Sequence, residues 1–153
     1  MPTAAAPQTT SLQVRRTFAA PREKVFRAWT DPKTLKEWFG PPGFKTTVAE
    51  VDLRVGGKFR LTLQKPTGEV VTAFGAFREI RPSERLVCSW NWDYNDIGDT
   101  TVTLEFLDAG GETDLVLTHE RFQNVEQRDS HNVGWTGCFD QLEKFLHSQK
   151  GVR

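Results

Sequence analysis

Hydrophobic and polar residues alternate over residues 11–20, where Leu12, Val14 and Phe18 are separated by polar side chains. A period of two is typical of a strand with one buried face, so a β-strand is predicted here. Residues 1–10 are rich in Ala, Thr and Pro, show no such period and are expected to be disordered. The folded part of the chain is therefore predicted to begin with a strand.

Two short helices, joined by a kink, are predicted after this strand. The first follows a proline and repeats apolar residues at helical spacing, namely Val25, Phe26 and Trp29. The second begins at an Asp-Pro pair, which suits an N-cap and the first helical position, and it ends at the Gly-Pro-Pro-Gly run of residues 40–43.

Six more strands are predicted from the alternation that follows. They cover residues 44–55, 58–63, 69–80, 86–92, 101–106 and 115–119, with turns rich in Gly and Pro between them. Apolar residues occupy both parities of the third of these strands, and Gly75 in its middle predicts a bulge or a bend. Short connections between successive strands favour one antiparallel meander.

A long helix is predicted to close the chain. Asn124 and Gln127 have the spacing of a capping box. An apolar stripe follows, formed by Trp135, Cys138, Phe139, Leu142, Phe145 and Leu146. Extending the stripe backwards reaches His131 and Arg128, which are polar. The C-terminal half of this helix should therefore pack against apolar groups, while its N-terminal half faces surroundings that tolerate polarity.

The element order predicts an α+β fold in which a seven-stranded antiparallel sheet curls around the final helix. A single apolar stripe cannot cover a flat sheet of that width, whereas a wide sheet twists and coils. Any space between helix and sheet that side chains leave unfilled becomes a cavity. We expect one folded domain over residues 11–149.

Composition narrows the classes of function. The 153 residues suit a single domain, and 20 basic side chains balance 20 acidic ones, which gives no electrostatic signature for nucleic acid or an anionic membrane. No apolar run reaches the length of a membrane span, the N-terminus has no signal-peptide pattern, and two cysteines are too few for a disulfide scaffold. We therefore expect a soluble cytoplasmic protein, monomeric or homodimeric, without integral membrane contact.

A set of short motifs lies in order along most of the chain. They are APREKVF at 20–26, WTDP at 29–32, LKEWF at 35–39, VDLRVGGKF at 51–59, GAFREI at 75–80, RLV at 85–87, TVTLEF at 101–106 and GW at 134–135. This set resembles the START-like (SRPBCC) superfamily, and in particular the branch named for the C-terminal domain of the heat-shock-protein ATPase activator. The resemblance implies the helix-grip fold of the birch-pollen allergen, with an internal cavity for lipids, polyketides or flavonoid-like molecules.

Aromatic residues are the first candidates for such a site, since the chain has 5 Trp and 11 Phe beside a single Tyr. Strand and helix parity directs one group toward the grip: Phe59, Phe74, Trp90, Trp92, Phe122, Trp135 and Phe139. Trp38 and Phe39 would lie at the entrance and gate it, and a plain packing role fits Trp38 equally well. The same pattern also fits a solid core, so a pocket and close packing remain alternatives.

Two histidines are the candidate polar groups. His119 shares the parity of inward-facing Leu115 and Leu117, and His131 lies on the polar extension of the final helix. Either a satisfied core histidine or a group that orients a ligand fits His119, because neutral imidazole both donates and accepts hydrogen bonds. As a general acid–base pair, the two would suit a cyclase or hydrolase.

The sequence therefore favours binding of a small apolar ligand over catalysis. No nucleophile elbow, zinc-protease or paired-cysteine motif is present, so we assign no catalytic residue, metal or cofactor. Cys88 and Cys138 lie on apolar faces and are expected to be inert thiols. A co-chaperone that stimulates a heat-shock ATPase is the other alternative, disfavoured here because little chain precedes residue 11.

Overall fold

The computed structural model of the protein describes residues 10–94 and 100–151. The elements are β1 (Leu12–Phe18), α2 (Arg22–Thr30), α3 (Pro32–Trp38), β2 (Lys45–Val51), β3 (Lys58–Gln64), β4 (Val70–Arg81), β5 (Arg85–Trp92), β6 (Thr100–Ala109), β7 (Glu112–Glu120) and α4 (Val125–Gly151). This is the predicted order of one strand, two short helices, six strands and a long helix. Disorder was predicted for residues 1–10, and residues 1–9 of that segment lie outside the described residues.

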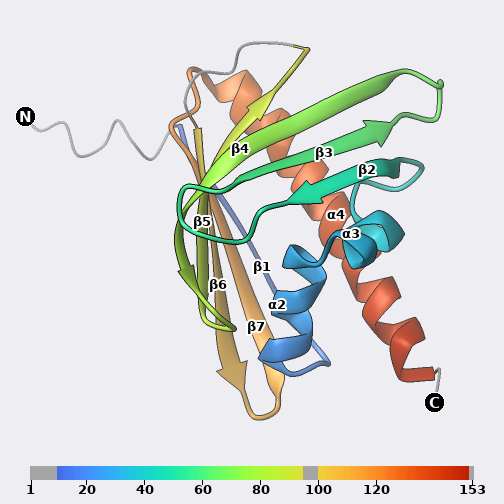
Figure 1. The fold of residues 1–153 in the computed structure, drawn as a ribbon, viewed down its shortest axis with the longest axis vertical. Helices are drawn as coiled ribbons and strands as arrows, with labels where there is room; N and C mark the ends of the chain where they lie inside the picture. The colour runs from blue at the N-terminus through green and yellow to red at the C-terminus, as the bar shows by residue number, and fades with distance from the viewer. Residues whose placement is uncertain (1–9, 95–99, 152–153) are drawn as a thin grey trace, which may run out of the picture.

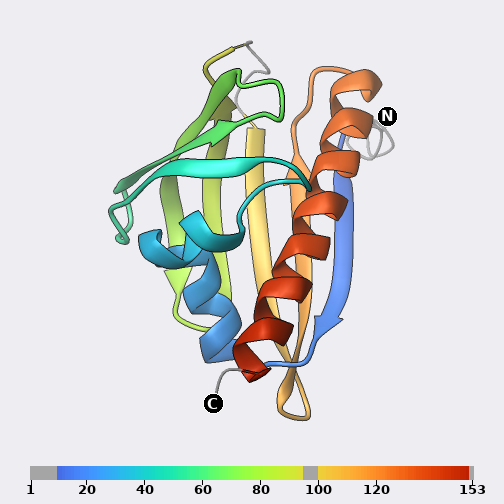
Figure 2. The same cartoon turned by 90° about the vertical axis from the view of Figure 1, so that its right-hand side faces the viewer.

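The strands form a single antiparallel sheet in the order β1-β7-β6-β5-β4-β3-β2. Every pair of sequential strands from β2 to β7 is adjacent, and β1 closes the order by pairing with β7. The sheet curls around α4, and Figure 2 shows this helix crossing the concave side next to β1, with α2 and α3 beside its C-terminal half (Figures 1 and 2). The predicted curled meander is confirmed.

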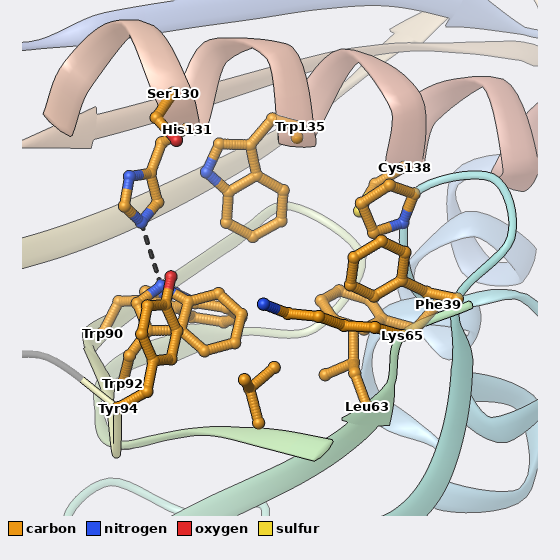
Figure 3. A pocket seen from close by; sticks show the side chains of 14 residues that line it. Phe39, Leu63, Lys65, Trp90, Trp92, Tyr94, Ser130, His131, Trp135 and Cys138 are labelled. Carbon is orange, nitrogen blue, oxygen red and sulfur yellow. Dashed lines mark hydrogen bonds between the residues drawn. The ribbon is translucent and has the colours of Figure 1, made fainter. Parts of the chain in front are cut away.

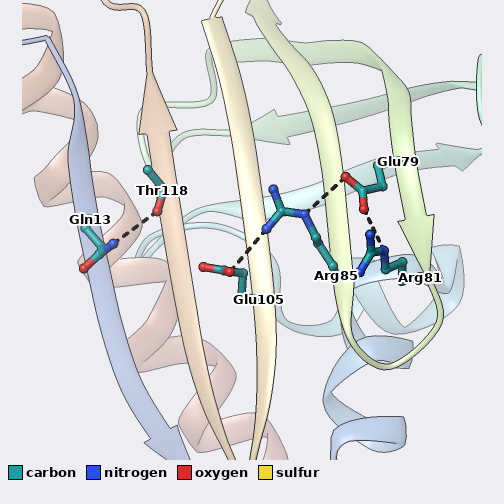
Figure 4. A network of polar contacts seen from close by, with 6 residues as sticks. All are labelled: Gln13, Glu79, Arg81, Arg85, Glu105 and Thr118. Carbon is teal, nitrogen blue, oxygen red and sulfur yellow. Dashed lines mark hydrogen bonds and ion pairs between the residues drawn. The ribbon is translucent and has the colours of Figure 1, made fainter. Parts of the chain in front are cut away.

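The two faces of the sheet differ in chemistry. The face turned away from α4 carries polar pairs, among them Arg85 with both Glu79 and Glu105 at 3.2 Å (Figure 4). These pairs are partly exposed and each contributes little to stability. The face toward α4 carries the core, so the sheet needs only one covering layer.

Helix α4 is defined by its start and by its stripe. The side chain of Asn124 accepts a hydrogen bond from the backbone N–H of Gln127 at 2.8 Å, and the side chain of Gln127 accepts one from the N–H of Gln123 at 3.2 Å. This is the predicted N-terminal cap. The predicted stripe is buried or, at Phe145, half-buried.

Two predicted details were wrong. The strand predicted over 44–55 ends at Val51, and the Asp52–Arg54 ion pair, 2.9 Å long, lies in the following turn. The irregularity of β4 falls between Phe77 and Glu79, where the register with β5 shifts, rather than at Gly75. Gly75 instead permits close approach, because a Cβ there would lie 2.0 Å from the carbonyl oxygen of Ser89.

The loop after α3, which contains Pro41 and Pro42, packs directly on α4 at Gly137. A Cβ at Gly137 would lie 2.9 Å from Cδ of Pro42, so only a residue without a side chain lets this loop pack so closely on the helix. The other glycine of α4, Gly134, differs, because a Cβ there would meet no protein atom within 4 Å.

Candidate functional site

A cavity of about 240 Å³ lies where the N-terminal half of α4 faces the ends of β3, β4 and β5 (Figure 3). The loop after α3 closes one side of it. The residues that line the cavity are Phe39, Pro41, Phe44, Leu63, Lys65, Val71, Trp90, Trp92, Tyr94, Ser130, His131, Gly134, Trp135 and Cys138. The change from apolar to polar residues along α4 thus coincides with the mouth of a pocket.

The aromatic residues deeper in the grip interlock. Ring centroids of Trp90 lie 5.0 Å from Trp135 and 5.5 Å from Phe59, and those of Trp29 and Trp38 lie 4.8 Å apart. The cavity left among them measures about 40 Å³, the size of one or two water molecules. Close packing therefore fills the interior, and the space for a ligand lies at the mouth.

Trp92 and His131 join the sheet to α4 across the mouth. The indole Nε1 of Trp92 donates a hydrogen bond to Nε2 of His131 at 2.9 Å, so this nitrogen is unprotonated. The other ring nitrogen, Nδ1, must then carry the proton, which it donates to the backbone oxygen of Gln127 at 2.8 Å. Burial lowers the pKa of His131, which keeps it neutral near pH 7.

His119 is fixed by a chain of hydrogen bonds beneath this pair. It has no exposed surface. Its Nδ1 accepts from the indole of Trp135 at 3.0 Å, its Nε2 therefore donates to Oγ1 of Thr100 at 2.9 Å, and Thr100 donates to the carbonyl of Trp90. Burial, and then the nearby ring of His131, hold the pKa of His119 well below its ordinary value.

The two histidines do not resemble an acid–base pair. Their ring centroids are 5.1 Å apart, yet all four ring nitrogens have protein partners. A general acid or base needs a nitrogen within reach of substrate. The arrangement instead supports the reading of His119 as a satisfied core histidine, and gives His131 a place in the pocket wall.

Most of the predicted site residues lie near the pocket, in three layers. Those that line it are Phe39, Trp90, Trp92, His131 and Trp135. Phe122 lies behind them, with its ring centroid 4.2 Å from that of His119 and 4.9 Å from that of His131. Phe59 lines the small inner cavity, and Phe139 is fully buried against Phe18 at 5.6 Å. Phe139 is therefore a core residue.

Two predicted site residues lie elsewhere. Phe74 was expected to face the grip, but its side chain is 41% exposed and pairs across the sheet with Arg60 and Asn91. Val71, Ala73 and Phe77 take the inward positions of β4 instead. Trp38 was expected at the entrance, but it is buried and donates a hydrogen bond from Nε1 to the carbonyl of Ala28 at 2.8 Å, which ties α3 to α2.

Sequence reasoning missed several residues of the wall. Lys65 and Tyr94 follow the ends of β3 and β5, where alternation stops, so no periodic signal marks them. Ser130 precedes His131 on α4 and is exposed. The Gly-Pro-Pro-Gly run of residues 40–43, interpreted only as a helix stop, supplies Pro41 to the wall.

Other chemistry is sparse in the part of the chain that the structure describes. Both cysteines are free and buried, and burial raises the pKa of each thiol to about 12, which keeps it protonated. The described residues contain no group of three or more His, Cys, Asp and Glu side chains placed to hold a metal ion. No helix within them is long and apolar enough to cross a membrane.

The curled sheet that holds a capped C-terminal helix defines a helix-grip domain of the START type. Residues 19–147 match the sequence model of the family described as "Activator of Hsp90 ATPase homolog 1-like protein". The chain belongs to this family, as its motifs suggested.

Solved structures and a curated relative agree with this assignment. Protein CV1439 from Chromobacterium violaceum has a TM-score of 0.82 and 27% identity over 90% of this chain and 96% of its own. The AHSA1 protein SPO3351 from Silicibacter pomeroyi has a TM-score of 0.82 and 23% identity over 91% and 99%, and shows the shared fold.

One curated relative is the human "Activator of 90 kDa heat shock protein ATPase homolog 1". It is 24% identical over 128 residues, which make up 83% of this chain and 34% of the relative. The chain thus spans about a third of the length of that protein.

Proposed function

We propose that the protein binds a small apolar, aromatic molecule in the pocket at the mouth of the grip. The observation that carries this proposal is the cavity of about 240 Å³ with walls formed by Trp90, Trp92, Trp135 and Phe39. Ligand pockets are typically apolar and concave, with a few polar groups that set orientation. Ser130, His131 and Lys65 are such groups here.

The size of the pocket sets the size of the ligand. An apolar cavity of about 150 Å³ in another protein accommodates benzene, so the present one suits a molecule of about two fused rings. Affinity would come chiefly from burying apolar surface, at roughly 25 cal/mol per Å².

Two free cysteines suit a reducing compartment, so we place this activity in the cytoplasm.

Titration with 2-naphthamide and 2-naphthoate, followed by tryptophan fluorescence, tests the proposal. Trp90, Trp92 and Trp135 line the pocket, so binding should change their emission. Gly134→Leu should abolish the change, because position 134 lines the pocket and an added side chain meets no protein atom within 4 Å of its Cβ.

Val133→Leu is the matched control, since Val133 is adjacent on α4 and 76% exposed. Native mass spectrometry of freshly purified protein is the companion measurement and should reveal a bound small molecule. An absence of both a co-purified molecule and a response to either naphthalene probe would overturn the proposal.

Stimulation of a heat-shock ATPase is the second candidate function. It is supported by the family match and by the name of the human relative. An ATPase assay with a 90 kDa heat shock protein tests it, and an unchanged rate at saturating protein would reject it. Gly134→Leu should leave such stimulation unaffected, since that role needs no filled pocket.

A further inference from the structure

We infer that the pocket selects ligands that carry an anionic group, namely aromatic carboxylates, through Lys65. This inference rests on the proposed function, since it names the class of molecule that the same pocket would bind. It is based on the charge lining the pocket and on the surroundings of that charge.

Lys65 is the only lining residue, among those that the structure describes, with a full charge at neutral pH. It follows β3, and its backbone N–H donates to the carbonyl of Glu69 at 2.7 Å, which fixes the start of its side chain. Figure 3 shows that side chain extended into the space between Phe39 and the Trp92–Tyr94 side. Its side chain is 33% exposed, so the charge lies at the edge of an apolar wall.

The ammonium group is held where it can meet a ligand. Nζ of Lys65 lies 5.7 Å from the centroid of the Tyr94 ring, within the range of a cation–π contact. Among the described residues, it forms an ion pair with Glu69, at 3.4 Å and with a Glu69 side chain that is 63% exposed. An exposed pair of this kind contributes little, so a ligand carboxylate would displace Glu69 at small cost.

The remaining polar groups of the wall carry no charge. Both nitrogens of His131 are engaged by Trp92 and Gln127, and so neither offers a free lone pair to a donor. The hydroxyls of Ser130 and Tyr94 can each donate as well as accept a hydrogen bond. The ammonium group of Lys65 therefore sets the charge preference of the pocket, which suits a carboxylate.

The ligand class follows from the two halves of the pocket. The aromatic walls and the volume of about 240 Å³ suit one or two fused rings. The position of Lys65 at the edge places the carboxylate toward solvent, where it retains part of its hydration. Burying an unpaired carboxylate deep in the grip would be costly. The ring system of the ligand therefore lies inside the pocket, and its carboxylate lies at the edge.

The test compares 2-naphthoate with 2-naphthamide, which have nearly the same shape and differ in charge. Wild-type protein should bind the carboxylate about tenfold more tightly, the scale of a charged hydrogen bond that is partly exposed. Lys65→Met should remove this preference by weakening naphthoate alone, and Lys65→Arg should retain it. Lys58→Met is the control, because Lys58 is an exposed residue of β3 outside the pocket.

Equal affinity of wild-type protein for the two probes would overturn the inference and leave the proposed function standing. Equal weakening of both probes by Lys65→Met would also overturn it, because that result assigns Lys65 to the apolar wall. Failure of both probes to bind would reject this inference, and it would also remove the proposed function if no small molecule co-purifies. Loss of naphthoate preference in Lys58→Met would show a general charge effect and would likewise reject the role of Lys65.

Discussion

The indole nitrogen of Trp135 donates a hydrogen bond to Nδ1 of His119 over 3.0 Å, at a place where the histidine has no exposed surface. One side chain comes from α4 and the other from β7. This bond therefore joins α4 to the concave face of the sheet. It also fixes which nitrogen of His119 carries the proton. The pocket wall and the core share this contact, since Trp135 belongs to both.

Trp135→Phe should separate this hydrogen bond from the packing of the ring. The variant leaves the buried Nδ1 of His119 without a donor, at a cost of about 1–3 kcal/mol in the free energy of unfolding. Trp135→Ala also removes the buried ring and should cost about 3–5 kcal/mol. Urea unfolding measures both, and a Trp135→Phe variant as stable as the wild-type protein would mean that the indole N–H contributes nothing.

Stability should fall as the pH drops from 7.5 to 5.5. The folded-state pKa values of His119 and His131 lie below the ordinary 6.5, so in this window the unfolded chain binds more protons than the folded one. The free energy of unfolding therefore decreases once the pH passes below about 6.5. Denaturant titrations at several pH values would show the slope.

His131→Gln should make that pH dependence shallower, because one of the two histidines with a lowered pKa is gone. His147→Gln is the control, since His147 is an exposed residue of the same helix. A slope unchanged by His131→Gln would contradict the assignment of the acid sensitivity to this side chain.

The two glycines of α4 should respond to alanine in opposite directions. A methyl group at Gly134 meets no protein atom within 4 Å, so Gly134→Ala should stabilise by about 0.5–1 kcal/mol through helix propensity. A methyl group at Gly137 would lie 2.9 Å from Pro42, and Gly137→Ala should destabilise by about 1–3 kcal/mol. Thermal unfolding of the ligand-free variants compares them, and a Gly137→Ala variant at least as stable as the wild-type protein would be inconsistent with the loop contact.

Phe59 and Phe74 test the two faces of the sheet. Phe59 is buried and lines the inner cavity, so Phe59→Ala should cost about 3–5 kcal/mol in the free energy of unfolding. Phe74 lies on the outer face, and Phe74→Ala should cost about 1 kcal/mol or less. Comparable losses in urea unfolding would place Phe74 in a packed environment.

The fold was predictable because its signals are periodic. Alternation defined the strands, and the spacing of Trp135, Cys138 and Phe139 defined the buried side of α4. The error at Phe74 has a specific cause. Strand β4 has apolar residues on both parities, so periodicity alone does not identify the inward set, which is Val71, Ala73 and Phe77.

The pocket was predictable only in part. The polar extension of the α4 stripe located its mouth at His131, and the aromatic strands supplied Trp90 and Trp92. Lys65 and Tyr94 come from segments where strands end, and their position depends on how the sheet curls rather than on any spacing in the sequence. Interlocking of the deeper rings likewise depends on three-dimensional packing.

The contact of Gly137 with Pro41 and Pro42 has a consequence for how this architecture diversifies. One boundary of the pocket is set by a connecting segment pressed on the helix, outside the hydrogen-bonded ladder of the sheet. Lengthening or shortening that segment would change the volume of the pocket, while the register of every strand would stay the same. The same fold can thus accommodate ligands of different size through changes to a few residues between α3 and β2.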